Sequence, residues 1–322
     1  MSPPKSASRI TQRIERETGV PGLAALLAER LAPADLTSLL LEVSRRRAAI
    51  RTPAQVLAQY ERDRFVRPSG VAPARLLGWE RAALASLPAE FEALALSPVC
   101  PLGTSSAVAG VHQDWAVTTT RGTEVVSDAT NVLALEAAAR RRNFLRQDAR
   151  SARAVHLAAS HRLLRPQFSS DPTRSAHFSL FALVSAGRAG AGSTFELGAL
   201  ETHLRVHLTA LRAFLGPEVP LRVTVSDFSG RDRGRAVAEL LNSLQASFEG
   251  VTAQPDPERT HGQGYYTGLC LHIYAQADGQ EYFLGDGGEV DWTQKLLGNA
   301  KERLFVSGLG GERVCQVFAE RE

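Results

Sequence analysis

Cysteine is scarce in this chain of 322 residues, and the three that occur, Cys100, Cys270 and Cys315, lie far apart. None of them forms the Cys-x-x-Cys pair of zinc and redox motifs, and an odd number does not make a disulfide framework. His203 and His207 stand four residues apart on a predicted helix, but no third ligand is identifiable, so we interpret them as part of an exposed helix face. The sequence therefore predicts reduced thiols and no metal site.

Long apolar runs and a strong charge of one sign are also lacking. No stretch approaches the roughly 20 apolar residues that span a bilayer, and the polar N-terminus lacks the apolar segment of a signal peptide. The 37 basic and 34 acidic residues leave a net charge of only +3, which does not by itself indicate nucleic-acid binding. With 44% hydrophobic residues, the chain can bury a sizeable core. We expect a soluble cytoplasmic protein without a membrane segment.

Proline, glycine and serine gather between residues 67 and 73, and this composition is typical of a linker. We therefore predict two parts, an N-terminal helical region at 1–72 and a core domain at 73–322. Within the first, Thr52 followed by Pro53 is typical of a helix start. Ser193 and Glu196 have the spacing of a capping box at the start of a later helix.

The core domain mixes both kinds of element. Apolar spacing predicts helices at 74–87, 130–145, 193–215 and 233–247, strands at 94–98, 118–126, 177–185 and 221–225, and a hairpin at 265–284. Because several neighbouring strands would be antiparallel, this order favours the α+β class.

Three segments of the core carry chemistry. The first is a predicted strand that ends at Leu164-Arg165-Pro166-Gln167, then a polar loop to Arg174, then a strand that opens with His177-Phe178. Arginine matches phosphate oxygens with a bidentate fork, and an aromatic ring can stack on a base. Taken alone, this segment is weak evidence, because such a pattern is more often an ordinary surface hairpin.

The second segment is an apolar strand with small residues, Phe305 to Gly311, followed by Glu312 and Arg313. Small residues let a ligand or another backbone approach a strand closely. The third segment runs from His261 to Gly268 and contains the pair Tyr265-Tyr266 between glycines; a second glycine-rich run, Gly285 to Asp291, follows it. Paired tyrosines flanked by glycines indicate the wall of a binding site.

In this order, the three segments resemble the core of the class II aminoacyl-tRNA synthetases, and the resemblance covers roughly residues 74–317. Arg165 to Phe178 is similar to motif 2, Gly308 to Arg313 to motif 3, and the helix and strand from Trp79 to Pro98 to motif 1. The two glycine-rich runs resemble the histidine-binding boxes of histidyl-tRNA synthetase, which also occur in the regulatory subunit of ATP phosphoribosyltransferase. Asp128-Ala129-Thr130 is similar to the glutamate-x-threonine element of that family.

The resemblance implies a class II antiparallel sheet flanked by helices, a homodimer built on motif 1, and binding of ATP with Mg²⁺. It implies that ATP is bound by Arg165 at the α-phosphate, Arg174 or His177 at the outer phosphates, Arg313 at the γ-phosphate, Phe178 and Gln167 at adenine, and Glu312 within motif 3. Arg165 and Arg313 would also be the catalytic pair. The amino-acid pocket would be formed by Asp128 at an amino group, Thr130, His261, Tyr265 and Tyr266.

Several positions depart from the family pattern. Gln167 replaces the motif 2 glutamate, His261 stands where the family has an arginine four residues before the first tyrosine, and Leu180 replaces a glutamine. Glu289 stands where an arginine follows the paired glycines. The chain ends about nine residues after Arg313, so we expect no anticodon-binding domain. These departures argue against a conventional histidyl-tRNA synthetase.

Three functions remain open at this point. The first is an ATP-dependent, adenylate-forming ligase that acts on an amino acid or related carboxylate, favoured by the retained arginines. The second is a non-catalytic regulatory subunit with a protein partner, like that of ATP phosphoribosyltransferase in histidine biosynthesis. The third is a tRNA-binding or nucleic-acid-binding factor, against which the near-neutral charge weighs. We take the first as the leading hypothesis.

Overall fold

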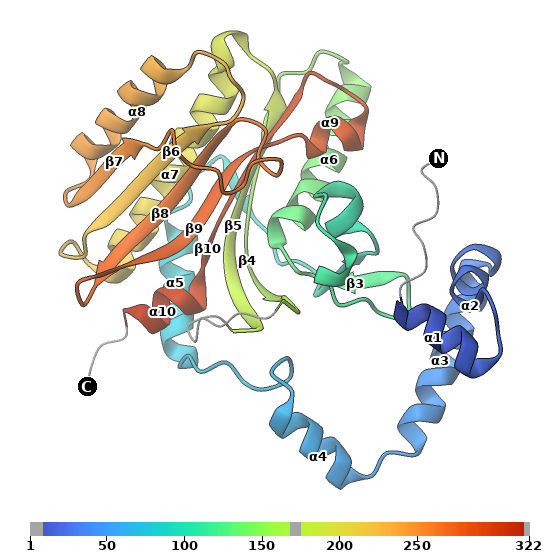
Figure 1. Ribbon diagram of the computed structural model, residues 1–322. Coiled ribbons are helices and arrows are strands. Elements are labelled where there is room, and N and C mark those ends of the chain that lie inside the picture. The colour runs from blue at the N-terminus through green and yellow to red at the C-terminus, as the bar shows by residue number, and fades with distance from the viewer. Residues whose placement is uncertain (1–8, 168–174, 319–322) are drawn as a thin grey trace. The chain divides into compact units, whose positions relative to one another are not determined.

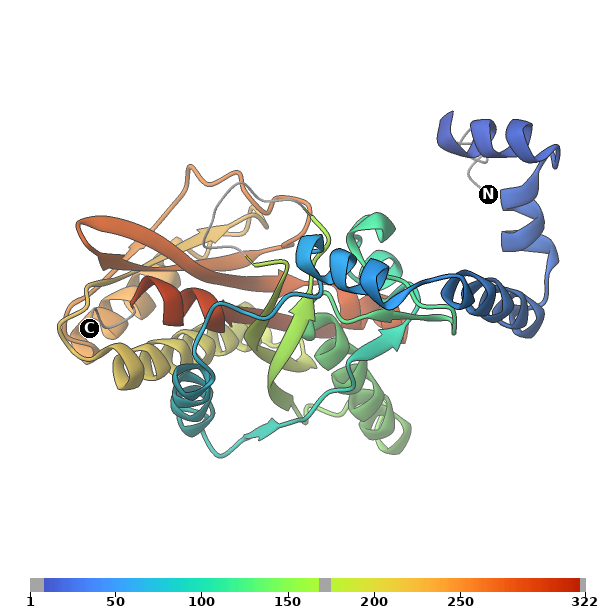
Figure 2. The same ribbon diagram turned by 90° about the horizontal axis from the view of Figure 1, so that it is seen from below.

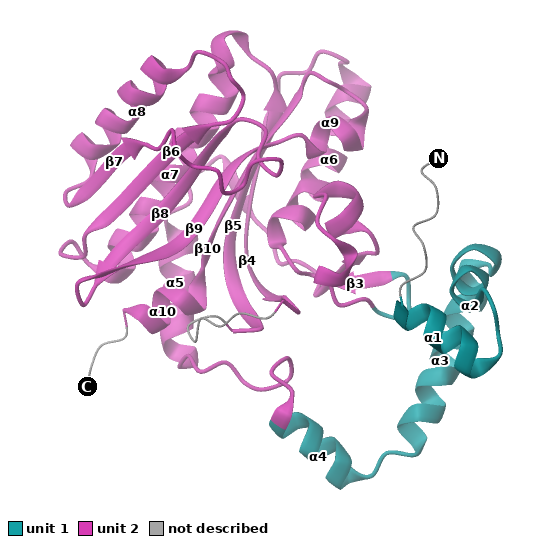
Figure 3. Cartoon of the chain, viewed as in Figure 1, with its two compact units in different colours: residues 1–61, 119–122 teal, residues 62–118, 123–322 magenta. Residues whose placement is uncertain are grey.

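The computed structural model describes residues 9–167 and 175–318, and the chain separates into two units (Figure 3). One unit comprises residues 1–61 and 119–122, and the other comprises residues 62–118 and 123–322. The described part of the first unit is helical. Its elements are α1 (Arg9–Thr18), α2 (Leu23–Ala25), a π-helical turn (Leu26–Arg30), α3 (Pro33–Ala49) and α4 (Pro53–Arg62), which ends one residue into the second unit.

Helix α4 begins where Thr52-Pro53 predicts, and α3 begins in a similar way. A proline opens each of them, where the missing N–H group would have no helical partner in any case. At the start of α4, the Gln55 backbone N–H donates to the Thr52 hydroxyl (3.3 Å), and the Thr52 N–H donates to the Gln55 side-chain oxygen (2.9 Å). This reciprocal pair is a capping box. No residue within α1 to α4 is buried.

The second unit is built on an eight-stranded sheet with the order β1-β4-β5-β10-β9-β8-β6-β7 (Figure 1). The strands are β1 (Phe91–Ala93), β4 (Val155–Leu164), β5 (His177–Arg188), β6 (Leu221–Asp227), β7 (Val251–Pro255), β8 (Leu269–Ala277), β9 (Gln280–Val290) and β10 (Glu302–Gly310). The six central strands pair antiparallel, and only the edge pairs β1–β4 and β6–β7 are parallel. The predicted α+β class and antiparallel sheet are confirmed.

Helices cover both faces of this sheet, with α7 and α8 running along one of them (Figures 1 and 2). That face packs against α5 (Pro73–Ala85), α7 (Thr194–Leu215) and α8 (Gly234–Ser247), while α6 (Ala129–Gln147) and α9 (Trp292–Leu297) pack against the other. Strand β5 is therefore apolar on both sides, since Phe181 faces the first core and Leu180 the second. Helix α10 (Gly311–Val317) follows β10 directly, and β2 (Val99–Pro101) pairs with β3 (Thr123–Val125) in a small second sheet.

Three local expectations were wrong. Residues 94–98 are not a strand, because β1 ends at Ala93 and only the Leu94 N–H still bonds to the sheet, at the Ala158 carbonyl (2.8 Å). Ser193 makes no capping bond, because its backbone is left-handed (φ 60°), and Glu196 instead forms an ion pair with Arg303 (2.9 Å).

His203 and His207 are fully buried rather than exposed, because α7 lies on the sheet. Both hydrogen-bond to the Ser307 hydroxyl on β10, at 2.7 Å each. Burial lowers the pKa of His207 to about 3, so its ring is neutral. In the described part of the chain, no helix is both long and apolar enough to cross a membrane.

Candidate functional site

A cavity of about 390 Å³ opens in the second unit on the α6 face, among β5, β9, β10 and the segments that follow β4 and precede β8. It brings together nine of the residues named from the sequence, which lie up to 185 positions apart (313 − 128): Asp128, Thr130, Arg165, Gln167, Phe178, Tyr265, Tyr266, Glu312 and Arg313. Its volume falls within the usual range for small-molecule sites.

Arg165 is held at the wall of the cavity by its neighbours in sequence and in space. Its backbone N–H donates to the Ala176 carbonyl (2.8 Å), which prolongs the β4–β5 hairpin by one residue. Its side-chain Nε donates to the Ser127 carbonyl (2.9 Å), and Nη2 lies 3.2 Å from Oδ2 of Asp128. The guanidinium carbon is 5.1 Å from the centre of the Phe178 ring. Arginine and aromatic ring therefore form one surface of the cavity.

Asp128 has both carboxylate oxygens engaged. It is the N-cap of α6, and Oδ1 accepts hydrogen bonds from the Thr130 backbone N–H (2.9 Å) and hydroxyl (2.8 Å). Its Oδ2 faces Arg165. A carboxylate is favoured at this position by the capping bonds and by the positive end of the helix dipole. Asp128 thus joins α6 to the arginine wall.

The segment before Asp128 is held by a buried carboxylate, Glu124 on β3. Its oxygens accept hydrogen bonds from Gly103, Ser105 and Gln113 at 2.7 to 3.0 Å, and the Ser105 hydroxyl lies 2.9 Å from that of Ser127. Burial acts to raise the pKa of Glu124, but these donors outweigh it and leave the pKa below its usual value. The ionised carboxylate therefore fixes the loop that carries the Ser127 carbonyl to Arg165.

At the same end of the cavity, Gln167 has a buried amide oxygen that accepts no hydrogen bond from any residue the structure describes. Such an acceptor is costly to bury unless a ligand or water donates to it. Arg313 enters from the first turn of α10, on the other side of the cavity. A Cβ added to Gly308 would lie 3.0 Å from the Leu180 side chain, so β10 approaches β5 closely here.

Glu312 lines the cavity, but its carboxylate is already used. Oε1 lies 2.8 Å from Nη2 of Arg162 on β4, and Oε2 accepts a hydrogen bond from the Ser179 backbone N–H on β5. The side chain is almost fully buried, with 2% exposure. These contacts attach α10, and with it Arg313, to the β4–β5 hairpin.

Two of the predicted site residues do not line the cavity, and a third cannot be placed. His177 accepts a hydrogen bond from Arg162 (2.9 Å) and donates to the Arg67 carbonyl (2.6 Å). His261 is exposed; its backbone carbonyl accepts a hydrogen bond from Nε of Arg259 (2.8 Å), and its ring centre lies 6.1 Å from that of His272. Arg174 lies outside the described residues.

At the other end of the cavity, Tyr265 and Tyr266 pack edge to face with ring centres 5.0 Å apart. Burial raises the pKa of both hydroxyls well above the usual value, so both remain protonated. Asp286 on β9 adds a half-buried carboxylate to the lining. Burial raises the pKa of Asp286 as well. The tyrosine end is thus polar but enclosed.

Sequence reasoning missed Asp286, and also Arg259, which packs near Tyr266. The signal for Asp286 was an acidic residue inside a strand of glycines, a costly choice unless it has a function. Arg259 stands six residues before Tyr265, and its guanidinium carbon lies 5.7 Å from the Tyr266 ring centre. It is 7% exposed, yet Nη1 and Nη2 make no hydrogen bond with the described residues.

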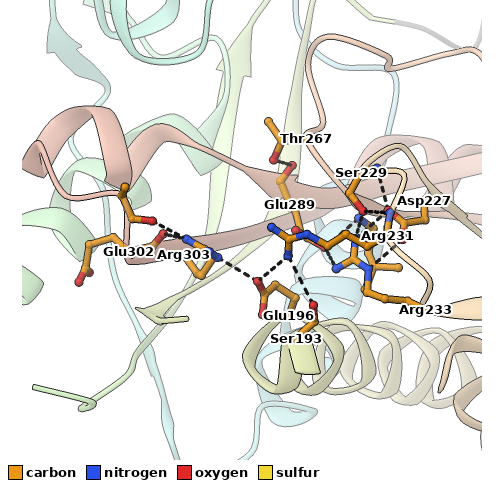
Figure 4. A network of polar contacts seen from close by, with 12 residues as sticks. Ser193, Glu196, Asp227, Ser229, Arg231, Arg233, Thr267, Glu289, Glu302 and Arg303 are labelled. Carbon is orange, nitrogen blue, oxygen red and sulfur yellow. Dashed lines mark hydrogen bonds and ion pairs between the residues drawn. The ribbon is translucent and has the colours of Figure 1, made fainter. Parts of the chain in front are cut away.

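Glu289, which departs from the family pattern, belongs to a network of polar contacts outside this cavity (Figure 4). Its Oε1 accepts from Arg233 (2.6 Å) and from the Leu269 backbone N–H (2.8 Å), and Arg233 makes a two-pronged contact with Asp227 (2.7 and 2.8 Å). A Cβ at Gly268 would lie 2.5 Å from the Glu289 carboxylate. The Glu289 side chain therefore has a structural role: it connects β9 to β8 and to the start of α8.

The sequence matches no protein-family profile and no curated protein, but the structure is similar to solved structures. An ATP phosphoribosyltransferase regulatory subunit/histidyl-tRNA synthetase from Bacillus halodurans matches with a TM-score of 0.58 and 12% identity, over 80% of this chain and 83% of that one. A histidine–tRNA ligase subunit from Alicyclobacillus acidocaldarius matches with a TM-score of 0.55 and 15% identity, over 78% and 96%. Histidyl-tRNA synthetase from S. aureus matches with a TM-score of 0.53 and 12% identity, over 77% and 68%. The chain therefore has the class II aminoacyl-tRNA synthetase fold of the histidyl-tRNA synthetase-like proteins.

Proposed function

We propose that this protein binds ATP and activates a carboxylate, an amino acid or a related acid, by adenylation. The observation that carries the proposal is the convergence of Arg165, Arg313 and Phe178 on one cavity from separate elements. Two guanidinium groups suit the phosphate chain of a nucleotide, and an aromatic face suits its base. The unsatisfied amide oxygen of Gln167 in the same cavity suits the exocyclic amine of adenine, which is a donor.

The chemistry needs little from the protein beyond positioning and charge. In adenylation, a carboxylate oxygen forms a bond to the α-phosphorus of ATP, and the bond to pyrophosphate breaks. Neither step needs an acid or base from the protein, because the nucleophile is already ionised. Holding both reactants in line and stabilising negative charge on the phosphates supply the rate enhancement. Arg165 and Arg313 can stabilise the negative charge on the phosphates, and the Asp128 contact fixes the orientation of Arg165.

Magnesium would accompany ATP. The two carboxylates near the arginines are already engaged, Asp128 by Thr130 and Arg165, and Glu312 by Arg162 and Ser179. The described residues contain no group of three or more His, Cys, Asp or Glu that could hold a metal ion. Mg²⁺ typically keeps several waters and binds substrate phosphates with only one or two protein carboxylates. It would therefore arrive with the nucleotide and neutralise part of the phosphate charge.

Isothermal titration with ATP and magnesium tests the proposal, followed by a screen for amino-acid-dependent exchange of pyrophosphate into ATP. We expect measurable ATP binding, and exchange with one or a few acids. Arg313→Ala should weaken ATP binding, whereas Arg235→Ala on the exposed face of α8 provides a matched control. If the unsubstituted protein binds no ATP at millimolar concentration, adenylation is excluded and the regulatory alternative takes its place.

A further inference from the structure

The segment that leads into α5 contacts the backbone next to Arg165. Residues 63–71, here termed the strap, run from the end of α4 to the start of α5 and belong to the second unit (Figure 3). Arg64 of the strap donates from Nη2 to two backbone carbonyls, those of Pro166 (2.6 Å) and Gln167 (2.9 Å). One side chain from the strap therefore holds the two peptide groups that directly follow Arg165.

The strap meets the β4–β5 hairpin where its ladder of backbone hydrogen bonds ends. The backbone N–H of Arg165 makes the last of these bonds, and Pro166 has no N–H with which to continue the ladder. Arg64 supplies a donor at this point instead. On the other strand, His177 donates to the Arg67 carbonyl of the strap (2.6 Å). The strap thus contacts both strands of the hairpin at the edge of the cavity.

Gln167 is the cavity residue whose orientation depends most directly on this contact. Its backbone carbonyl accepts from Arg64, while its side chain lines the cavity with a buried amide oxygen that has no donor in the described part of the chain. Fixing the backbone fixes the direction in which the side chain leaves it. An amide oxygen held in one place accepts a hydrogen bond from an amine and repels a carbonyl oxygen. Adenine presents an amine at that edge, and hypoxanthine a carbonyl oxygen.

We propose that Arg64 is a positioning residue of the nucleotide site, and that it sets the preference for adenine by holding Gln167 in place. This inference rests on the proposed function, because it names a determinant of base selectivity at the same site. Arg64 does not line the cavity formed by the described residues. Loss of a direct charge contact would weaken all nucleoside triphosphates alike, whereas an effect transmitted through Gln167 depends on the base.

The test is titration of the full chain with ATP and with inosine triphosphate, each with magnesium. The two nucleotides share the sugar and the phosphates, and inosine triphosphate has a carbonyl oxygen where ATP has the amine. We expect the unsubstituted protein to bind ATP roughly tenfold more tightly, and Gln167→Ala to lose this preference. Arg64→Ala should reduce the preference to about threefold or less, mainly by weakening ATP binding.

Three further variants separate positioning from charge and from stability. Arg67→Ala is the matched control, because it removes the same charge from the same strap and keeps the backbone carbonyl that His177 contacts; it should leave the preference unchanged. Arg64→Lys keeps the charge and a donor but not the planar fork, so it should retain part of the preference. In a Gln167→Ala chain, Arg64→Ala should not change the ratio of affinities further, because both substitutions act on one interaction. Thermal melts check that each variant is folded.

The inference is overturned if Arg64→Ala weakens both nucleotides equally, if it changes neither affinity, or if the unsubstituted protein does not distinguish them. Equal binding of both nucleotides by the unsubstituted protein removes this inference alone and leaves adenylation in place. Absence of binding of either nucleotide removes both proposals.

Discussion

The substitution of Arg165 separates a nucleotide clamp from a structural ion pair. In the free protein, Arg165 makes one hydrogen bond to the Ser127 carbonyl and one ion pair with Asp128. The two side chains of the pair are 40% and 23% exposed, so solvent screens their attraction. The ion pair is then worth roughly 0.2–1 kcal/mol, and the hydrogen bond about 0.5–1.5 kcal/mol. Arg165→Ala should therefore lower the free energy of unfolding by only about 1–2 kcal/mol.

The expected effect on ATP is larger. A charge-assisted contact to a phosphate is worth on the order of 1.5–3 kcal/mol, so Arg165→Ala should weaken ATP binding roughly tenfold to a hundredfold. Arg165→Lys should restore part of this, because lysine keeps the charge but not the planar fork.

Isothermal titration and urea denaturation of these two variants, with Arg235→Ala as the control, give both quantities. The reasoning is refuted if Arg165→Ala binds ATP as tightly as the unsubstituted protein. A large loss of stability in a protein that never binds ATP would instead identify Arg165 as a structural residue.

Four further outcomes are expected. Glu302→Gln should destabilise the fold by about 3–5 kcal/mol in urea denaturation, because it leaves the fully buried Arg141 without its charged partner. Asp286→Asn should melt at a higher temperature than the unsubstituted protein at neutral pH; burial raises the native pKa of Asp286, so its ionised form opposes folding, and the advantage should vanish as the pH falls through that pKa. A chain that begins at Arg62 should keep its ATP affinity in titration, whereas one that begins at Val71 should lose part of it together with the Arg64 contacts to the Pro166 and Gln167 carbonyls. Light scattering at micromolar concentration should give roughly twice the monomer mass of 34.7 kDa, since symmetric dimers are the commonest oligomers; a mass near the monomer would reject the homodimer.

Local patterns in the sequence were enough to predict most elements of the core. Apolar runs and the turn-forming residues between them indicated β5, α6, α7 and the β8–β9 hairpin. The turn of that hairpin has positive φ at both Asp278 and Gly279. They were less reliable where a pattern is short. The stretch 94–98 resembles a strand, but pairing with the sheet ends at Ala93, and strand pairing is a long-range property.

For the candidate site too, some residues could be predicted from local motifs and others could not. Arg165, Arg313, Phe178 and the tyrosine pair could be named from the sequence because each lies in a recognisable motif, and all of them line one cavity. The domain boundary at residue 72 and the ligand roles of these residues stay predictions. What the motifs could not supply was which charged groups neutralise one another, because that depends on distances between distant segments.

The sequence by itself therefore determined the class of the fold, from local spacing. Through the resemblance of its motifs to a known family, it also identified nine of the residues that line the cavity. Only the tertiary structure decided which partners these side chains have. Asp128 bonds to Thr130 and Arg165, Glu289 accepts a hydrogen bond from Arg233, and His203 lies buried against Ser307. The physical reason is that a charged or polar side chain acquires its role from the partners that folding places within hydrogen-bond distance. Asp286 has none among the described residues, and this distinguishes it from the other carboxylates of the cavity.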